Sequence, residues 1–200
     1  MHGAKKTRWF FDRRYNLNAP SKHKLRLEAL HERHPGLTAS LGGTFFEAAS
    51  VCLSRHHESP IDMNIVCNGG ASTQLVEFPK PDTHVLNAWA NDIDTTEWGA
   101  YGVSLAAVEI EEELVAIRRA ETLTGADWYV APIGTEAGDL ENCFRLEVSG
   151  TDVGGPSVIE IRLRHKIDQT RRGASNLPAI AAVVGFKEGV IAIQRVSDEK

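Results

Sequence analysis

An apolar run, AIAAVVGF at 179–186, limits the folds open to this chain more than any other segment. A strand with one face in water alternates polar and apolar residues, whereas an uninterrupted apolar run is typical of a strand covered on both faces. The segment GVIAIQRV at 189–196 follows after a short turn and completes a predicted β-hairpin. We therefore expect a central sheet that is covered by helices.

Helical and strand patterns alternate along the rest of the chain. A helix is expected at 21–34, because Ser21 is a good N-cap and Pro35 and Gly36 prevent continuation. The other predicted elements are a helix at 38–57, a hairpin of strands at 61–67 and 72–81, a long helix at 94–123, and strands at 127–133 and 143–150. The predicted class is α/β (α+β), a mixed central sheet flanked by helices with an N-terminal helical and hairpin extension.

The long helix at 94–123 is predicted from both its start and its apolar face. Asp94 and Glu97 have the spacing of a capping box. The apolar residues recur at helical spacing: Val103, Ala107, Ile110, Leu114 and Ile117. Such a stripe requires a sheet to pack against.

The segment SVIEIRLRHKIDQTRRG at 157–173 fits two structures. Its first half alternates apolar and charged residues as a strand does. Ser157 and Glu160, however, form a second capping box, and Gly173 is placed as a helix stop. We favour the helix, which places Arg162, Lys166 and Gln169 on one polar stripe.

Composition limits the class of protein further. The chain of 200 residues, 42% hydrophobic and 24% charged, is typical of a globular protein of one domain. We expect a basic arm with a short helix at 1–39 and a single α/β domain at 40–200. No apolar run is long enough to cross a bilayer, and the first residues lack a secretory signal pattern, so we expect a cytoplasmic protein with no membrane partner. The three cysteines are too few and too scattered for a disulfide framework or a thiolate metal site.

Basic residues gather at two places although the net charge is −5. They outnumber acids in residues 1–35, and a second cluster, RLRHKIDQTRR, spans 162–172. Each cluster is also typical of a solvated helix face. Local rather than net positive charge determines binding to phosphates, so we expect nucleic acid as a partner, with Arg162, Arg171 and Arg172 as contacts. A homodimer or a protein partner is also compatible with the sequence.

Two predicted strands each carry one carboxylate, Asp127 in GADW and Glu147 in LEVSG. A helix that begins near Glu97 precedes these strands, and a helix with Lys166 and Gln169 follows them. In this arrangement residues 94–196 resemble the core of the PD-(D/E)xK nuclease superfamily, of which the chain would be a divergent member. The resemblance implies a restriction-endonuclease-like core and hydrolysis of nucleic acid, as in a microbial defence module.

The resemblance also implies roles for individual residues. Asp127, Glu147 and the main-chain carbonyl of Val148 are expected to bind Mg²⁺ (or Mn²⁺), which lowers the pKa of the attacking water. Ser149 stands where the family usually has lysine, and the resemblance implies that Lys166 on the next helix takes over that position. Gln169 is a further catalytic candidate, which orients Lys166 or a phosphate oxygen. The supporting residues are Ser149 and Glu97, and Glu97 is expected to help through a second metal position or a metal-bound water.

Each candidate also has a purely structural interpretation. Asp127 is suited to starting a strand, Glu97 to capping a helix, and Lys166 to an exposed helix surface. Phe144, Leu146 and Val148 form the apolar face of their strand, so Glu147 is suited to a solvent face beside Arg145. Glu113 and Glu121 are alternative supporting acids. The second functional hypothesis is therefore a noncatalytic nuclease-like protein that docks on a protein partner.

Overall fold

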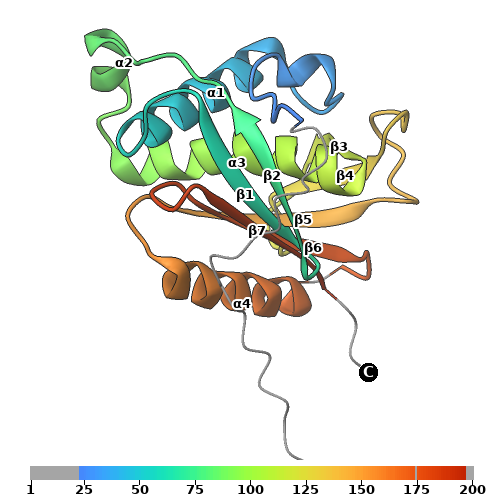
Figure 1. Ribbon diagram of the computed structural model, residues 1–200. Coiled ribbons are helices and arrows are strands. Elements are labelled where there is room, and N and C mark those ends of the chain that lie inside the picture. Colours follow the sequence, from blue (N-terminus) through green and yellow to red (C-terminus); the bar gives the residue numbers. More distant parts are fainter. Residues whose placement is uncertain (1–22, 174, 197–200) are drawn as a thin grey trace, which may run out of the picture.

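The computed structural model describes residues 23–173 and 175–196, and the described elements surround one mixed sheet that curls into a half-barrel (Figure 1). The protein belongs to the α/β class. The strands lie in the order β2-β1-β7-β6-β5-β4-β3. They are β1 (Ile61–Cys67), β2 (Gly70–Val76), β3 (Leu114–Arg119), β4 (Trp128–Pro132), β5 (Phe144–Thr151), β6 (Ala179–Gly185) and β7 (Val190–Val196).

The apolar run at 179–186 provides the middle strand, as its sequence predicts. Every residue of β6 is buried. It pairs with β5 in parallel and with β7 as the antiparallel hairpin that the sequence indicates. The burial on both faces explains why no polar residue interrupts this strand.

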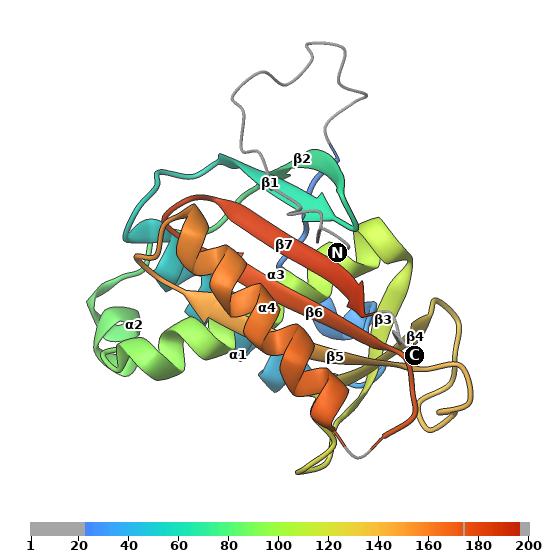
Figure 2. The same cartoon turned by 90° about the horizontal axis from the view of Figure 1, so that it is seen from below.

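Helices cover both faces of the sheet (Figures 1 and 2). On one face lie α1 (Ala39–Ser54), α2 (Thr83–Ala88), α3 (Asp92–Glu112) and the short 3₁₀ helix η1 (Leu30–Glu32). On the other lies α4 (Pro156–Arg172), whose Ile159 and Leu163 pack on β6 and β7. The segment 157–173 is thus a helix, as favoured. No helix in the described part of the chain is long and apolar enough to cross a bilayer.

The predicted long helix at 94–123 is wrong in its second half. The helix ends at Glu112, Glu113 adopts the left-handed conformation, and residues 114–119 form β3. Acidic side chains at a helix C-terminus oppose the helix dipole, so the glutamates at 111–113 favour an end there. The apolar residues at 114–117 are buried in two clusters on opposite faces of the sheet, which suits a strand.

The details of three other helix predictions are also wrong. In the described part of the helix predicted at 21–34, residues 23–29 form no helix; Leu25 and Leu27 are buried and alternate with more exposed residues, as in an extended segment. Neither predicted capping box forms. Asn91 caps α3, and α4 begins after Gly155 without a side-chain cap. Residues 1–22, with most of the predicted basic arm, lie outside the described residues.

Residues 23–37, called here the N-terminal strap, bind both edge strands of the sheet. On β2, the N–H of Leu25 donates to the carbonyl of Leu75 at 2.9 Å. On β3, the N–H of Gly36 donates to the carbonyl of Ala116 at 2.8 Å, and the N–H of Ala116 donates to Nδ1 of His34 at 2.9 Å. The strap thereby satisfies backbone groups at edges that otherwise invite intermolecular pairing.

The buried side chain of His34 anchors the strap. Since Nδ1 accepts from a backbone N–H, the neutral ring carries its proton on Nε2, which lies 3.2 Å from Oε2 of Glu109 on α3. Arg33 donates to the same carboxylate at 2.8 Å. The strap is therefore joined to both an edge strand and a helix.

We expect Gly36→Ala to destabilise the protein, because a Cβ at this position would lie 2.5 Å from the carbonyl carbon of Ile117. Backbone atoms cannot move aside as a flexible side chain can, so the free energy of unfolding should fall by about 1–3 kcal/mol in urea titrations. The matched control is Gly43→Ala in α1, where no atom lies within 4 Å of the new Cβ. The control should raise stability by about 0.5–1 kcal/mol. Equal effects of both substitutions would contradict the close approach of strap and β3.

Candidate active site

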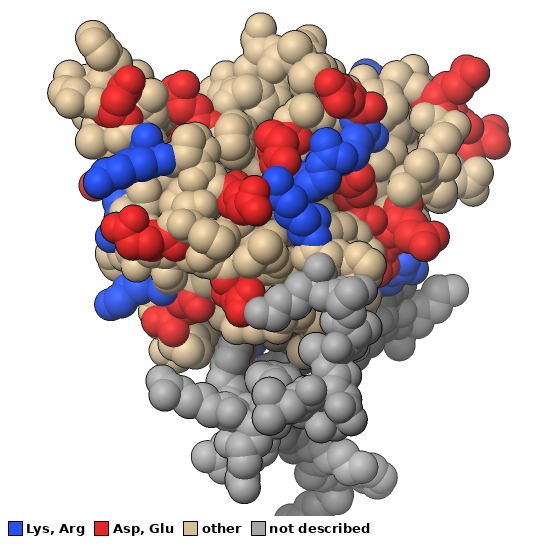
Figure 3. Space-filling model, turned by 45° about the horizontal axis from the view of Figure 1, so that its top comes forward, with Lys and Arg blue, Asp and Glu red and all other residues tan. Residues whose placement is uncertain are grey.

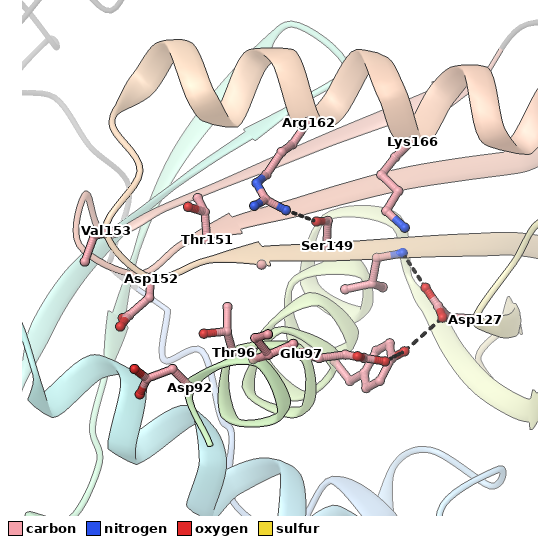
Figure 4. A pocket seen from close by; sticks show the side chains of 14 residues that line it. Asp92, Thr96, Glu97, Asp127, Ser149, Thr151, Asp152, Val153, Arg162 and Lys166 are labelled. Atoms are coloured by element: carbon pink, nitrogen blue, oxygen red, sulfur yellow. Dashed lines mark hydrogen bonds between the residues drawn. The ribbon is translucent and has the colours of Figure 1, made fainter. Parts of the chain in front are cut away.

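Asp127 directly precedes β4, at the point where the pairing between β4 and β5 begins. Its N–H donates to the carbonyl of Leu146 at 2.8 Å, which fixes the backbone beside β5. Its Oδ2 accepts from the N–H of Val148 at 2.8 Å (Figure 4). Asp127 therefore extends the hydrogen bonding along β5 beyond β4: its backbone bonds to Leu146, and its side chain bonds to Val148.

Glu147 faces α4 and is only 2% exposed. Its Oε1 lies 2.5 Å from Nζ of Lys166, and the same ammonium donates to Oε1 of Gln169 at 3.3 Å. Burial raises the pKa of the Glu147 carboxyl above its ordinary value, the charge of Asp127 raises this pKa further, and Lys166 opposes the rise. Asp127 and Glu147 line one and the same cavity.

The interpretation of this strand face as exposed to solvent is wrong, because α4 covers it. Arg145 is also buried there and donates to main-chain carbonyls on three different segments. The acceptors are Thr124, Thr170 and Leu177, at 2.9–3.0 Å. Arg145 thus fastens the C-terminal end of α4 to β5 and so sets the position of Lys166.

Tyr101 on α3 joins the acids from the opposite face of the sheet. Its hydroxyl oxygen lies 2.7 Å from Oε1 of Glu97 and 2.9 Å from Oδ1 of Asp127, and it accepts from Arg119 at 3.1 Å. Burial, followed by the charge of Asp127, raises the pKa of this hydroxyl. A hydroxyl has one proton for these two carboxylates, so further positive charge near them is favourable.

A glycine allows α3 to lie this close to β5. A Cβ at Gly150 would meet the carbonyl oxygen of Thr96 at 2.7 Å. The approach places Glu97 and Tyr101, one turn apart on α3, beside the strand that carries Glu147. Glu97 is therefore near the acids, although it does not cap its helix.

Two cavities open on either side of Asp127, which lines both. The α3 cavity, of about 490 Å³, is bounded by Glu97 on α3, by Ser149 on β5, and by Arg162 and Lys166 on α4 (Figure 4). The β3 cavity, of about 600 Å³, is lined by residues 119–123 and 125–127 and by Glu147, Gln169, Arg172 and Gly173. The two cavities, called here the cleft, share Asp127, and Glu147 lines the β3 cavity.

The basic candidates differ in their relation to this cleft. Arg162 lines the α3 cavity and donates to the hydroxyl of Ser149 at 3.3 Å. Arg172 lines the β3 cavity. Arg171 lines neither cavity, and its guanidinium lies 3.9 Å from Asp168.

Away from the cleft, charges of both signs are mixed. On the face shown in Figure 3, Lys and Arg side chains lie among Asp and Glu side chains. At the far end of the α3 cavity, Asp152 is paired with Arg55 at 2.9 Å and with His56 at 2.8 Å. Of the alternative supporting acids, Glu113 ends α3, whereas Glu121 lines the β3 cavity and binds Arg118 and the hydroxyl of Tyr129.

The donor set at the acids suits a small, hard cation. Within residues 23–173 and 175–196, no group of three or more His, Cys, Asp or Glu side chains is placed to hold a metal ion. Mg²⁺, however, is commonly bound by one or two carboxylates together with waters and substrate phosphates. Asp127 and Glu147 provide two carboxylates, and strand geometry turns the carbonyl of Val148 to the same side as its N–H, toward Asp127. The oxygen donors therefore fit Mg²⁺ or Mn²⁺ and not a thiolate-bound metal.

Tyr101 and Arg119 are the two residues at the site that the sequence interpretation missed. Tyr101 lies between apolar positions of a helix, where an aromatic residue is usually part of the core. Arg119 was hidden because residues 114–119 were assigned to the helix. The run LVAI, apolar at four successive positions before RR, was the available signal for a strand.

Comparisons of the chain with protein-family models, with curated proteins and with solved structures gave no significant match.

We expect Lys166→Met to destabilise the protein in a pH-dependent manner. The raised pKa means that folded Glu147 binds more protons than unfolded Glu147, so its ionisation costs stability as the pH rises above its ordinary pKa of 4.5. Without Lys166 this pKa rises further. Because Lys166 is partly exposed, the loss at pH 7 should be about 3 kcal/mol, the low end for breaking a buried pair, and should shrink toward pH 4.

Urea titrations at the two pH values measure this effect. Combining Lys166→Met with Glu147→Gln should remove most of the pH dependence, because no buried carboxylate remains to be ionised. Arg164→Met is the matched control, since Arg164 is exposed and pairs with Glu160 on the surface of the same helix; its effect should be below 1 kcal/mol. An equal loss for Lys166→Met at both pH values would mean that packing, not charge, is responsible.

Proposed function

We propose that this protein is a metal-dependent nuclease of the PD-(D/E)xK type, with a restriction-endonuclease-like core, that hydrolyses phosphodiester bonds of nucleic acid in the cytoplasm. One observation carries the proposal: the ammonium of Lys166 contacts buried Glu147, and Asp127 lines the same cavity as Glu147. Two neighbouring carboxylates and a lysine in an open cleft are the groups that this reaction needs. A microbial defence module is the setting that the resemblance suggests.

The two carboxylates and the carbonyl of Val148 would hold Mg²⁺ or Mn²⁺. When bound, this ion supplies a water of lowered pKa and neutralises charge on the phosphate. Glu97, joined to Asp127 through the hydroxyl of Tyr101, supports the position of Asp127 and would bind a water of the ion.

Lys166 supplies the positive charge that Ser149 does not. An ammonium beside the attacking oxygen stabilises hydroxide and the charge that develops on the phosphate. The contact with Gln169 orients the ammonium, and α4 carries both residues on one face. Ser149 and Arg162, joined by a hydrogen bond, are placed to bind a phosphate oxygen in the α3 cavity.

Nucleic acid would lie along α4. Arg162 and Arg172 line opposite cavities and have no carboxylate partner among the described residues. They are ten positions apart on the helix, about 15 Å along its axis. Arg171 lies outside the two cavities, and its expected contact with nucleic acid is one to a more distant phosphate.

A noncatalytic nuclease-like protein that docks on a protein partner is the second candidate. Two observations favour it: Ser149 stands in place of the usual lysine, and no group of three ligating side chains occurs in the described residues. The two proposals differ in whether the acids support metal-dependent cleavage.

The purified protein should cleave labelled DNA or RNA in the presence of Mg²⁺ or Mn²⁺, and should not do so in excess chelator. Asp127→Asn and Glu147→Gln should each reduce the single-turnover rate by about a thousandfold or more, because each removes a metal-binding carboxylate. Gel analysis of single- and double-stranded substrates measures the rate.

Glu160→Gln is the matched control, because Glu160 pairs with Arg164 on the outer surface of α4. Its rate should equal that of the unsubstituted protein, and circular dichroism should show that all three variants are folded. Cleavage that survives both Asp127→Asn and Glu147→Gln would refute the site. No cleavage of any substrate by the folded protein would favour the noncatalytic candidate.

A further inference from the structure

Arg119 on β3 is held beside the acids by two aromatic rings. Its guanidinium carbon lies 4.5 Å from the ring centre of Tyr101 and 5.0 Å from that of Trp128. Its Nη2 also donates to the hydroxyl of Tyr101 at 3.1 Å. Stacking restricts the guanidinium and leaves its other N–H groups available to a ligand.

The positive charge of Arg119 is only weakly compensated. Its nearest carboxylate among the described residues is Asp127, at 3.8 Å, which is too long for a hydrogen bond. The neighbouring Arg118 differs, because it is directly paired with Glu121. The side chain of Arg119 is 49% exposed, so an anion can reach it.

Arg119 and Arg172 line the same β3 cavity from different elements, β3 and α4. Arg172 has no carboxylate partner in the described part of the chain, and its Nε donates to the carbonyl of Asp168 at 3.1 Å. Three acids line this cavity, and all are engaged: Glu121 binds Arg118 and Tyr129, and Glu147 binds Lys166. Asp127 accepts from the hydroxyl of Tyr101 and from the N–H of Val148. The cavity is therefore polar and positively charged on two sides.

We propose that the β3 cavity is a second phosphate-binding subsite, in which Arg119 and Arg172 bind a phosphodiester group next to the one that is cleaved. This assignment rests on the proposed function, because the acids mark the position of the cleaved bond. A guanidinium binds two phosphate oxygens with parallel N–H donors, which a stacked arginine is well oriented to do. Arg119 thus adds to the positive charge that β5 lacks at Ser149.

The two ends of the cleft therefore differ in their capacity to bind phosphate. Beyond Arg162, the far end of the α3 cavity carries Asp92 and Asp152, which are paired with Arg55. This end has little net charge to attract a phosphate. A strand that lies along α4 is then bound through phosphates on the Arg162 and Lys166 side and again in the β3 cavity.

Binding of a fluorescein-labelled single-stranded DNA, with Ca²⁺ in place of Mg²⁺, tests the subsite. The dissociation constant is measured by anisotropy at several salt concentrations for the unsubstituted protein, Arg119→Ala and Arg172→Ala. Each lost phosphate contact should reduce the slope of log affinity against log salt by about 0.7, and the double variant should lose about 1.4. Binding should weaken equally for oligonucleotides of different sequence.

Arg118→Ala and Arg119→Lys are the matched controls. Arg118 is paired with Glu121, so its loss should leave the slope unchanged. Arg119→Lys retains the charge and should retain the slope, while binding weakens because lysine lacks the planar guanidinium. If Arg119→Ala fails to fold, as judged by circular dichroism, Arg119→Gln takes its place with the same expected loss of slope.

The outcomes separate this proposal from the proposed function. Unchanged slopes for Arg119→Ala and Arg172→Ala, in a protein that cleaves with Mg²⁺, would overturn the subsite and leave the nuclease intact. Reduced slopes in a protein that never cleaves would support the subsite and overturn the nuclease. If the unsubstituted protein binds neither DNA nor the matching RNA, both are wrong.

Discussion

A carboxylate buried beneath a helix is the constraint on which the site depends. Glu147 lies between β5 and α4, where an unpaired charge would be strongly unfavourable. Lys166 relieves this cost only while α4 keeps its position on the sheet. Arg145, two residues earlier on the same face of β5, holds that position through carbonyls of Thr170 and Leu177. One strand therefore carries both the charge that requires the helix and the side chain that fastens it.

Both edges of the sheet depend on the N-terminal strap. Residues 23–37 bond to β2 and to β3, the two edge strands, and His34 links β3 to Glu109 on α3. The curl of the sheet brings these edges within reach of one stretch of chain (Figure 2). Because β3 carries Arg119, a segment remote from the acids helps to determine the shape of the cleft.

The sequence predicts those parts of the fold whose periodicity is undisturbed. The continuous apolar run of β6, the two hairpins and the helix of α4 follow from patterns of neighbouring residues. β3 was missed because Leu114 and Ile117 also continue the helical stripe, and only the burial of residues 114–117 on both faces separates the two structures. The resemblance predicts Lys166 near the attacking water, but its direct contact with Glu147 comes from the structure. Tyr101 and Arg119 reach the acids through tertiary packing that no local pattern encodes.

Because residue 149 is a serine, the positive charge near the acids is supplied by elements other than β5. A lysine on β5 would be held by the strand itself. Here the cations come from other elements, Lys166 from α4 and Arg119 from β3, and each is positioned by a separate set of contacts. Displacing α4 would expose Glu147 to water and remove Lys166 in one step. The electrostatics of the cleft are therefore coupled to the docking of its surrounding elements, more tightly than if the charge were on the central strand.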